Sequence, residues 1–249
     1  MVHAGGPESA PPSGRIDLAT LRGRLQADAW HLRSAAPFPH VALDTFLRPS
    51  AFTEQAQAFP GEPTGWSAVE IFGEQGEPLS HRKLAHGATG ALPPPLELLV
   101  AELQGGPFMA YLEDLTGICG LRGDPTHHGG LLHQYLRGAR LGVHLDANVQ
   151  PATGLDRRIN VIFYVHPTWE ADWGGELELY SPCGTACEQR LQPWPNRCVI
   201  FLNGPDAYHG LAPVQCPEDR QRRTIFLRYY TAGRPEAERR PPHRVRWLT

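Results

Sequence analysis

The second half of the chain is a succession of short apolar runs separated by turn residues, and this pattern limits the possible folds most. The runs that we expect to form strands are Leu131–Leu136, Leu141–Asp146, Arg158–Val165, Glu176–Tyr180, Arg197–Leu202 and Thr224–Tyr230. Gly174 and Gly175 form one of the turns between them. Closely spaced short strands of this kind are typical of a β-sandwich or a β-barrel. The sequence therefore predicts a mainly β core.

The first half has apolar residues at helical spacing and supplies the helices. The expected elements are a helix over Ile16–Arg33, a strand over His40–Leu47, a short helix over Pro49–Phe59, a loop-rich segment over 61–92 and two helices within Pro93–Thr116. The last two join near Gly105 and Pro107 and pack on the outside of the sheet. The predicted fold class is therefore α+β with a mainly β core.

The length of 249 residues is enough for one domain with a sizeable core. Residues 1–14 are rich in Gly, Pro and Ser and predict a disordered tail, which leaves residues 15–249 as the domain. The Arg/Pro-rich segment after Thr231 either packs back on the domain or stays loose.

The charge of the chain excludes several classes of partner. A net charge of −3 and a pI of about 6.4 argue against a nucleic acid or an anionic membrane. Because the sequence has no long apolar run and no signal peptide, we expect a soluble cytoplasmic protein. Cys183 and Cys187 lack a second Cys/His pair at zinc spacing, so the five cysteines are expected to be ordinary thiols. The oligomeric state is left open.

A His-x-Asp pair with a distant second histidine is the strongest chemical signal. His144 and Asp146 share one face of a strand because side chains alternate between the two faces. His209 follows Asp146 by 209 − 146 = 63 residues and can complete a set of two imidazoles and one carboxylate. This set leaves about three of six octahedral positions open, as in non-heme Fe(II) oxygenases.

Several motifs surround these residues in a specific order. They are His144-Leu-Asp146, Arg157-Arg-Ile-Asn-Val-Ile-Phe-Tyr-Val165, Trp173-Gly-Gly-Glu-Leu-Glu-Leu-Tyr180, Tyr208-His-Gly-Leu-Ala-Pro-Val214 and Arg222-Arg-Thr-Ile-Phe-Leu-Arg-Tyr-Tyr-Thr231. In these motifs the region of about residues 125–232 resembles bacterial members of the prolyl-4-hydroxylase-like branch of the Fe(II)/2-oxoglutarate dioxygenases. Residues 60–125 carry no informative motif.

The resemblance implies a fold and a set of cofactors. The fold is a double-stranded β-helix, a distorted jelly roll with helices on its outside, whose mouth holds the iron. The implied Fe(II) ligands are His144, Asp146 and His209, with 2-oxoglutarate as co-substrate, O2 as oxidant and ascorbate as a helpful reductant. The presence of Asp146 favours oxygenation over halogenation, because related halogenases lack this carboxylate.

The distal carboxylate of 2-oxoglutarate needs a cation, and the planar fork of arginine suits it. In this family the arginine begins the strand after the distal histidine, and here 222 − 209 = 13. Arg222 and Arg223 point to opposite faces of that strand, so only one of them is the ligand. Aligning the strand with the family favours Arg222.

The same alignment implies further contacts to the co-substrate. Tyr164 takes the position whose hydroxyl shares the carboxylate, and Asn160 lies on the same face of its strand. His133 or Gln134, on the strand before the metal motif, is a further contact to 2-oxoglutarate or substrate, and we assign it to Gln134.

Substrate contacts are expected on the same faces and at the rim. Arg228 lies six residues after Arg222, and a buried guanidinium needs an anion. That anion is either a substrate carboxylate or a structural partner, Glu176 or Glu178; alternatively, Arg228 points outward after a bulge. Asn148 is expected at the rim, and Trp173 as a wall over the mouth.

The expected function is hydroxylation of an unactivated C–H bond in a small molecule, such as an amino acid or an amino-acid-derived biosynthetic intermediate. The alternatives are a prolyl-type hydroxylase that acts on a protein, a non-catalytic binding module, and a hydrolase or isomerase with another metal. Fold alone does not separate them. A closed pocket favours the small molecule and an open groove favours the protein.

Overall fold

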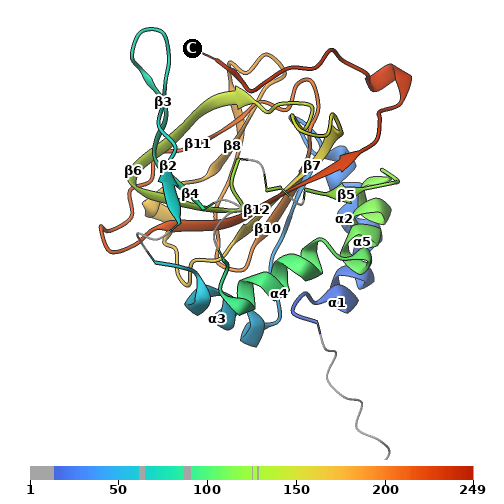
Figure 1. Cartoon of the computed structure of the whole chain (residues 1–249), viewed down its shortest axis with the longest axis horizontal. Helices are drawn as coiled ribbons and strands as arrows, with labels where there is room; N and C mark the ends of the chain where they lie inside the picture. Colours follow the sequence, from blue (N-terminus) through green and yellow to red (C-terminus); the bar gives the residue numbers. More distant parts are fainter. Residues whose placement is uncertain (1–13, 62–64, 87–90, 125, 128, 249) are drawn as a thin grey trace, which may run out of the picture.

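The computed structural model describes residues 14–61, 65–86, 91–124, 126–127 and 129–248. The described strands pair antiparallel in one sheet, whose main path runs β1-β10-β7-β12-β6-β11-β8-β9. The strands are β1 His40–Leu43, β2 Trp66–Ala68, β3 Ile71–Phe72, β4 Pro78–His86, β5 Arg122–Gly123, β6 Leu132–Leu145, β7 Asp156–Tyr164, β8 Leu177–Tyr180, β9 Cys187–Leu191, β10 Cys198–Leu202, β11 His209–Leu211, β12 Arg222–Thr231 and β13 Arg246–Trp247. The sheet curls into a nearly closed barrel, as expected of a double-stranded β-helix (Figure 1).

The helices gather along one side of the sheet (Figure 1). They are α1 Leu18–Gly23, α2 Leu25–Ser34, α3 Pro49–Ala58, α4 Pro94–Leu103 and α5 Gly106–Thr116, with short 3-10 turns η1 Ala171–Trp173 and η2 Glu236–Glu238. The prediction of two helices within Pro93–Thr116 is confirmed. The single helix predicted over Ile16–Arg33 is two helices, because the backbone of Arg24 is not helical (φ −110°, ψ 6°).

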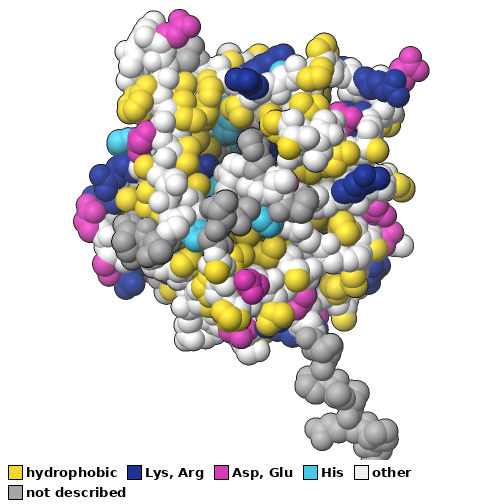
Figure 2. All heavy atoms as spheres, in the orientation of Figure 1, with side chains coloured by type: hydrophobic (Ala, Val, Ile, Leu, Met, Phe, Trp, Pro, Cys, Tyr) yellow, Lys and Arg dark blue, Asp and Glu magenta, His cyan; other side chains and the backbone are white. Residues whose placement is uncertain are grey.

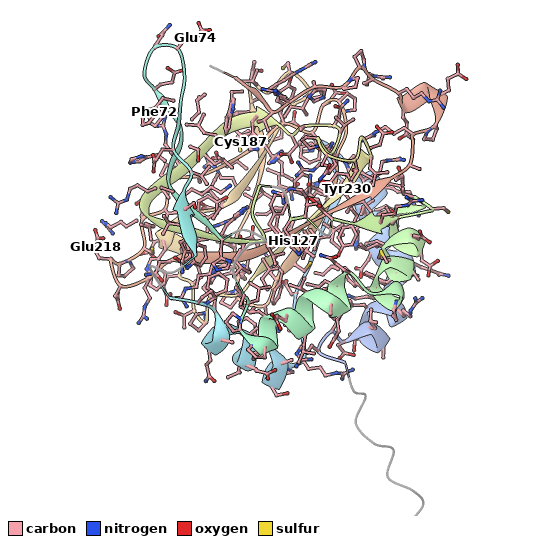
Figure 3. All side chains as sticks on the ribbon, in the orientation of Figure 1. Phe72, Glu74, His127, Cys187, Glu218 and Tyr230 are labelled. Carbon is pink, nitrogen blue, oxygen red and sulfur yellow. The ribbon has the colours of Figure 1, made fainter. Side chains whose placement is uncertain are left out.

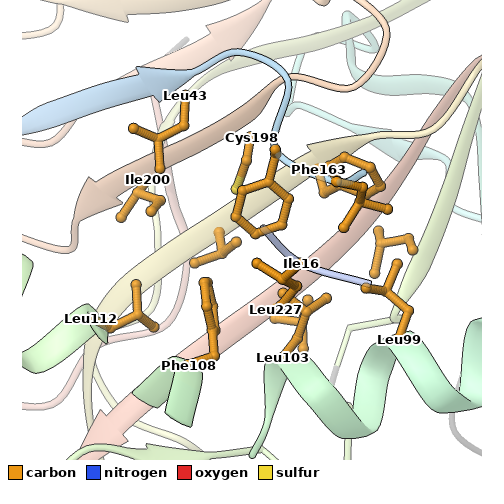
Figure 4. Packing of buried hydrophobic residues seen from close by; sticks show 14 of the residues in the cluster. Ile16, Leu43, Leu99, Leu103, Phe108, Leu112, Phe163, Cys198, Ile200 and Leu227 are labelled. Carbon is orange, nitrogen blue, oxygen red and sulfur yellow. The ribbon is translucent and has the colours of Figure 1, made fainter. Parts of the chain in front are cut away.

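The main hydrophobic core lies between these helices and one face of the sheet (Figure 4). Leu103 of α4 and Phe108 of α5 are fully buried there against Phe163 of β7 and Leu227 of β12. Each such side chain contributes roughly 1.5–3 kcal/mol through removal from water. This packing holds β7 and β12 rigidly, and the opposite faces of the same strands carry polar residues.

The segment 61–92, predicted to be loop-rich, contains three strands among its described residues. The longest, β4, pairs with β6 from Ser80 opposite Leu141 to His86 opposite Leu132. Its register shifts between His81 and Lys83, so the side chains do not alternate regularly along its sequence. The lack of a clean period-2 pattern is why sequence analysis missed it.

Two predicted strands, Leu131–Leu136 and Leu141–Asp146, are one long strand, β6. Gly138 lies within it at φ +81°, a conformation that glycine adopts without strain. A second irregularity lies between Leu141 and His144, where three steps along β6 pair with two along β11, so the strand face that points inward switches there.

The C-terminal segment packs back on the domain. Trp247 of β13 pairs with His144 of β6, and Arg246 pairs with Leu145. On another side of the same region, the hairpin that contains β3 stands out from the body, with Phe72 along it and Glu74 at its tip (Figures 1 and 3). In the described part of the chain, helices are too short or too polar to cross a lipid bilayer.

Candidate active site

Two neighbouring strands bring the His-Asp-His set together. His144 is the second-to-last residue of β6, Asp146 follows that strand, and His209 begins β11 directly opposite His144. One ligand atom from each residue lies within 4.8 Å of the others, and all three side chains are buried. The three residues therefore form a potential iron site.

Backbone carbonyls fix the orientation of both imidazoles. The Nδ1 of His144 lies 2.9 Å from the carbonyl oxygen of Gly142, and the Nδ1 of His209 lies 2.8 Å from that of Ala207. Since a carbonyl only accepts, each Nδ1 carries the proton and each Nε2 presents its lone pair. Burial lowers the pKa of both rings, that of His144 to about 3, which keeps them neutral. Neutral imidazoles with a carboxylate suit Fe(II).

A buried arginine and an amide hold the carboxylate of Asp146. Arg157 forms an ion pair with its Oδ2 at 2.8 Å, and Asn160 donates a hydrogen bond to the same oxygen at 3.2 Å. Burial alone would raise the pKa of Asp146, but Arg157 and the two imidazoles hold it below its ordinary value. Oδ1 has neither of these two partners, so it remains available to a metal. The amide of Asn160 is thus engaged with Asp146 and Arg157, not turned toward a co-substrate as expected from the family.

Arg222 and Arg223 lie on opposite sides of β12, as the alternation of a strand requires. The Arg222 guanidinium is buried, donates to the carbonyl oxygen of Gly175 at 2.7 Å and to the Tyr164 hydroxyl at 3.1 Å, and lies 5.1 Å from the ring centre of Tyr135. Burial raises the pKa of Tyr164, so its phenol stays protonated. Arg223 instead donates to Gln221 outside the pocket.

A cavity of about 270 Å³ connects these groups. His144, Asp146 and His209 line it together with Arg222 and Arg228. Its size is just below the usual range of about 300–1,000 Å³ for small-molecule sites. In the space-filling view, the projecting hairpin that contains β3 stands beside hydrophobic and histidine side chains on this face (Figure 2).

Arg228 faces this cavity, as the register of β12 predicted. The proposed structural partners are wrong: Glu178 pairs with Arg190 at 2.9 Å, and Glu176 accepts a hydrogen bond from Gln192. The Arg228 guanidinium donates to the carbonyl oxygen of Gly130 and lies 4.2 Å from the ring centre of Phe226.

Five predicted contact residues are not among those that line the cavity: Tyr164 and Asn160, described above, and three others. Gln134 donates to the carbonyl oxygen of Pro60 on the other face of β6, because His133 and Tyr135 take the cavity face. Asn148 binds the C-terminal segment, donating to the carbonyl oxygen of Pro241. Trp173 packs edge-on against Trp169 at 5.4 Å in a separate cluster.

The structure adds three cavity residues that sequence analysis missed. Tyr135 lies under the Arg222 guanidinium, and Trp247 stacks on the His144 ring with their centres 4.8 Å apart. Lys83 of β4 also lines the cavity. One signal existed for Lys83: it is the only lysine in the chain, against 22 arginines.

Comparison with known proteins agrees with this geometry. Residues 130–230 match the model of the 2OG-Fe(II) oxygenase superfamily. A 2OG-Fe(II) oxygenase family oxidoreductase from Burkholderia pseudomallei superposes with a TM-score of 0.57 at 15% identity, covering 83% of this chain and 90% of that one. No curated protein sequence matches significantly.

Two prolyl hydroxylases have a similar fold. The enzyme from Trichoplax adhaerens, in complex with a hypoxia inducible factor peptide fragment, has a TM-score of 0.57 at 16% identity and covers 85% of this chain and 92% of its own. A Pseudomonas putida prolyl-4-hydroxylase has a TM-score of 0.55 at 15% identity, covering 84% of this chain and 100% of its own.

The matched region contains every group of the potential iron site and the strand that carries Arg222. Proteins of this superfamily use Fe(II), 2-oxoglutarate and O2. Residues 130–230 of this chain match a 2OG-Fe(II) oxygenase domain, and these solved structures share its fold.

Proposed function

We propose that the protein is an Fe(II)- and 2-oxoglutarate-dependent hydroxylase of a small molecule, an amino acid or an amino-acid-derived biosynthetic intermediate. The observation that carries this choice is the small cavity of about 270 Å³. It has to hold both the co-substrate and the group to be oxidised. A cavity of this size suits a compact substrate better than a length of polypeptide.

The residues divide between the metal and the co-substrate. His144, Asp146 and His209 would hold Fe(II), and Arg222 with the Tyr164 hydroxyl would bind the distal carboxylate of 2-oxoglutarate. Among the described residues, the Arg222 guanidinium has no carboxylate partner within 4.0 Å, which suits a ligand carboxylate. Bound iron with 2-oxoglutarate and O2 supplies an oxidant strong enough to break an unactivated C–H bond.

The protein's own contribution is to orient the reactants and exclude water. Arg157 and Asn160 fix the carboxylate of Asp146, and the Gly142 carbonyl fixes His144. Because these ligand side chains are fixed before the reactants bind, the reacting groups can be held in the correct relative orientation. Trp247 covers His144 and lines the same cavity, so it shields the metal site from solvent.

The second candidate is a hydroxylase of prolyl or other residues in a protein. The Trichoplax relative in complex with a peptide favours it, because the two chains share a fold. The same fold also belongs to the epimerase SnoN from nogalamycin biosynthesis, at a TM-score of 0.54 and 13% identity. The fold is therefore compatible with several reactions, and substrate choice depends on the walls of the cavity.

Succinate formation tests the proposal. Protein purified without oxygen would receive Fe(II), ascorbate and 2-oxoglutarate, then air, with no addition, with a panel of amino acids and N-acyl amino acids, or with proline-containing peptides. We expect slow succinate formation alone and faster formation with a member of the small-molecule panel. Acceleration by peptides only would favour the protein hydroxylase. No succinate from iron-loaded protein in any condition would contradict both.

A further inference from the structure

The cavity contains more positive charge than the iron site and 2-oxoglutarate require. Its described lining residues include four cations, Lys83, Arg157, Arg222 and Arg228, and one carboxylate, Asp146. Arg157 is paired with Asp146, and the proposed function gives Arg222 to the co-substrate. Lys83 and Arg228 remain without an assigned anion.

Arg228 is buried, and the described residues offer it little compensation. Its guanidinium makes one hydrogen bond to a described residue, the carbonyl oxygen of Gly130, and has no described carboxylate within 4.0 Å. Asp146 and Asp124 act on it only from further away, and burial followed by Arg157 lowers its pKa to about 10. A guanidinium that stays charged at this value needs an anionic partner to offset its loss of water.

Lys83 enters the cavity from β4, on the other side of β6 from β12. Its ammonium lies 5.6 Å from the ring centre of Tyr135 and has no described ion-pair partner. Burial lowers its pKa to about 7, and among the neighbouring charges Arg228 lowers it most, ahead of Arg222. Lys83 shares the cavity with Arg228, and neither side chain has a described carboxylate within 4.0 Å.

We propose that the substrate is a small dianion without a free ammonium group, and that Lys83 and Arg228 bind its two acidic groups. This inference rests on the proposed function and specifies its substrate class. Two carboxylates, or one phosphate monoester, would supply the charge that both side chains lack. An acidic group between or against them would stabilise the charged form of Lys83.

We infer that the substrate has no free ammonium group because the described lining of the cavity offers no available carboxylate to pair with one. Asp146 is the one carboxylate among the described lining residues, and both the metal site and Arg157 use it. An α-ammonium in this cavity would meet cations and neutral groups only. An amino acid whose nitrogen is acylated, or a dicarboxylate with no amine, avoids this repulsion.

Matched ligands test the charge requirement. N-acetyl-L-aspartate and N-acetyl-L-glutamate carry two carboxylates, and their amides, N-acetyl-L-asparagine and N-acetyl-L-glutamine, have nearly the same shape with one charge fewer. L-Aspartate and L-glutamate restore the ammonium, and glycerol 3-phosphate tests phosphate as the acidic group. Binding would be measured by calorimetry without oxygen on protein loaded with Fe(II) and 2-oxoglutarate, and succinate formation would follow in air.

We expect at least one dianion, carboxylate or phosphate, to bind at least about 30-fold more tightly than the singly charged amides and the amino acids that carry an ammonium. Neutralising either cation, by Lys83→Met or Arg228→Gln, should reduce that preference to a few-fold. Lys83→Arg and Arg228→Lys, which keep the charge, should restore much of it. Arg223→Gln removes a guanidinium from the opposite face of β12 and should leave the preference unchanged.

Equal binding of the dianions and their singly charged amides, or no binding of any dianion at about 10 mM, which corresponds to roughly −3 kcal/mol, would overturn the inference. So would a Lys83→Met variant whose KM for 2-oxoglutarate rises as much as that of Arg222→Gln, since the ammonium would then serve the co-substrate. The proposed function has a separate test, because succinate formation without added substrate does not depend on the substrate's charge. Absence of succinate from iron-loaded protein in every condition would contradict the proposed function itself.

Discussion

The two faces of β12 show how one strand can serve two purposes. Ile225, Leu227 and Tyr229 point into the main core under the helices, where even the Tyr229 hydroxyl finds a partner, the carbonyl oxygen of Leu103 at 2.6 Å. Arg222 and Arg228 point the other way, into the cavity with the iron site. The side chains on the core face therefore find all their packing and hydrogen-bond partners within the protein. Arg222 and Arg228 on the cavity face have no described carboxylate partner, which suits the binding of ligands.

This difference separates stability from function along a single strand. Substitutions on the core face should change the free energy of unfolding and leave ligand affinity alone. Substitutions on the cavity face should do the reverse. The predictions below test this separation, beginning with the largest effect.

Substitution of a metal ligand should give the largest loss of ligand affinity with little change in the free energy of unfolding. His144→Ala removes one of the three ligands, so we expect iron affinity to fall at least about 100-fold, while unfolding remains cooperative. Metal analysis after desalting would measure it, with folded Leu227→Ala as the control that keeps its iron. Retention of stoichiometric iron by His144→Ala would disprove the assignment of the ligands.

Leu227→Ala should show the core-face effect. The side chain is 3% exposed and packs in the main core, so its truncation should cost about 2–5 kcal/mol of unfolding free energy. Urea unfolding would measure this loss. In the folded fraction the KM for 2-oxoglutarate should stay within about twofold of wild type, and a large rise would show that the two faces are not independent.

Acid should destabilise the protein through a buried histidine that lies at neither the metal nor the main core. His166 lies beside the start of β12, where it accepts a hydrogen bond from the Arg223 backbone N–H, and burial lowers its pKa to about 3. Below pH 6.5 the unfolded chain binds a proton there that the folded chain does not, so stability falls as the pH falls. At pH 5 this amounts to about 2 kcal/mol.

The His166→Gln variant isolates this contribution. Denaturant unfolding at pH 7 and pH 5 should show a smaller pH effect in the variant than in wild type, by about 2 kcal/mol. The exposed His31→Gln serves as control. An identical pH dependence in wild type and His166→Gln would mean that this ring does not carry the effect.

Trp247→Ala should have the smallest effect. Its ring stacks on His144, and an aromatic contact of this kind contributes about 1 kcal/mol. We therefore expect about fivefold weaker iron binding, measured by competition with a chelator. Trp30→Ala, which removes a tryptophan that is 62% exposed on α2, should leave iron affinity unchanged. If both variants bound iron like wild type, the C-terminal segment would have no part in the site.

Sequence analysis succeeded where periodicity was regular. The alignment with the family placed Arg222 inward, and because side chains alternate along a strand, Arg228, six residues later, was expected on the same face. His144 and Asp146 could be predicted as a pair because residues two apart in a strand lie on the same face. His209 lies opposite His144 because β11 pairs with β6. This pairing could be predicted only from the fold of the family that the sequence resembles.

It failed where the strands are irregular. Counting back ten residues from His144 puts Gln134 on the cavity face, but β6 has an extra residue between Leu141 and His144, which reverses the faces and turns His133 and Tyr135 inward. Lys83 was missed because β4 has a register shift and a polar sequence. Residues joined by long-range contacts, such as Asn148 and the C-terminal segment, carry no local signal of their partner.

The most direct test of the account compares the two neighbouring arginines. Uncoupled succinate formation would be followed against 2-oxoglutarate concentration for wild type, Arg222→Gln and Arg223→Gln. The account predicts a KM for 2-oxoglutarate raised about 100-fold in Arg222→Gln, as for loss of one partner of a buried charge pair, and within about twofold of wild type in Arg223→Gln. The reverse order, or equal effects, would contradict the division of β12 into a core face and a cavity face.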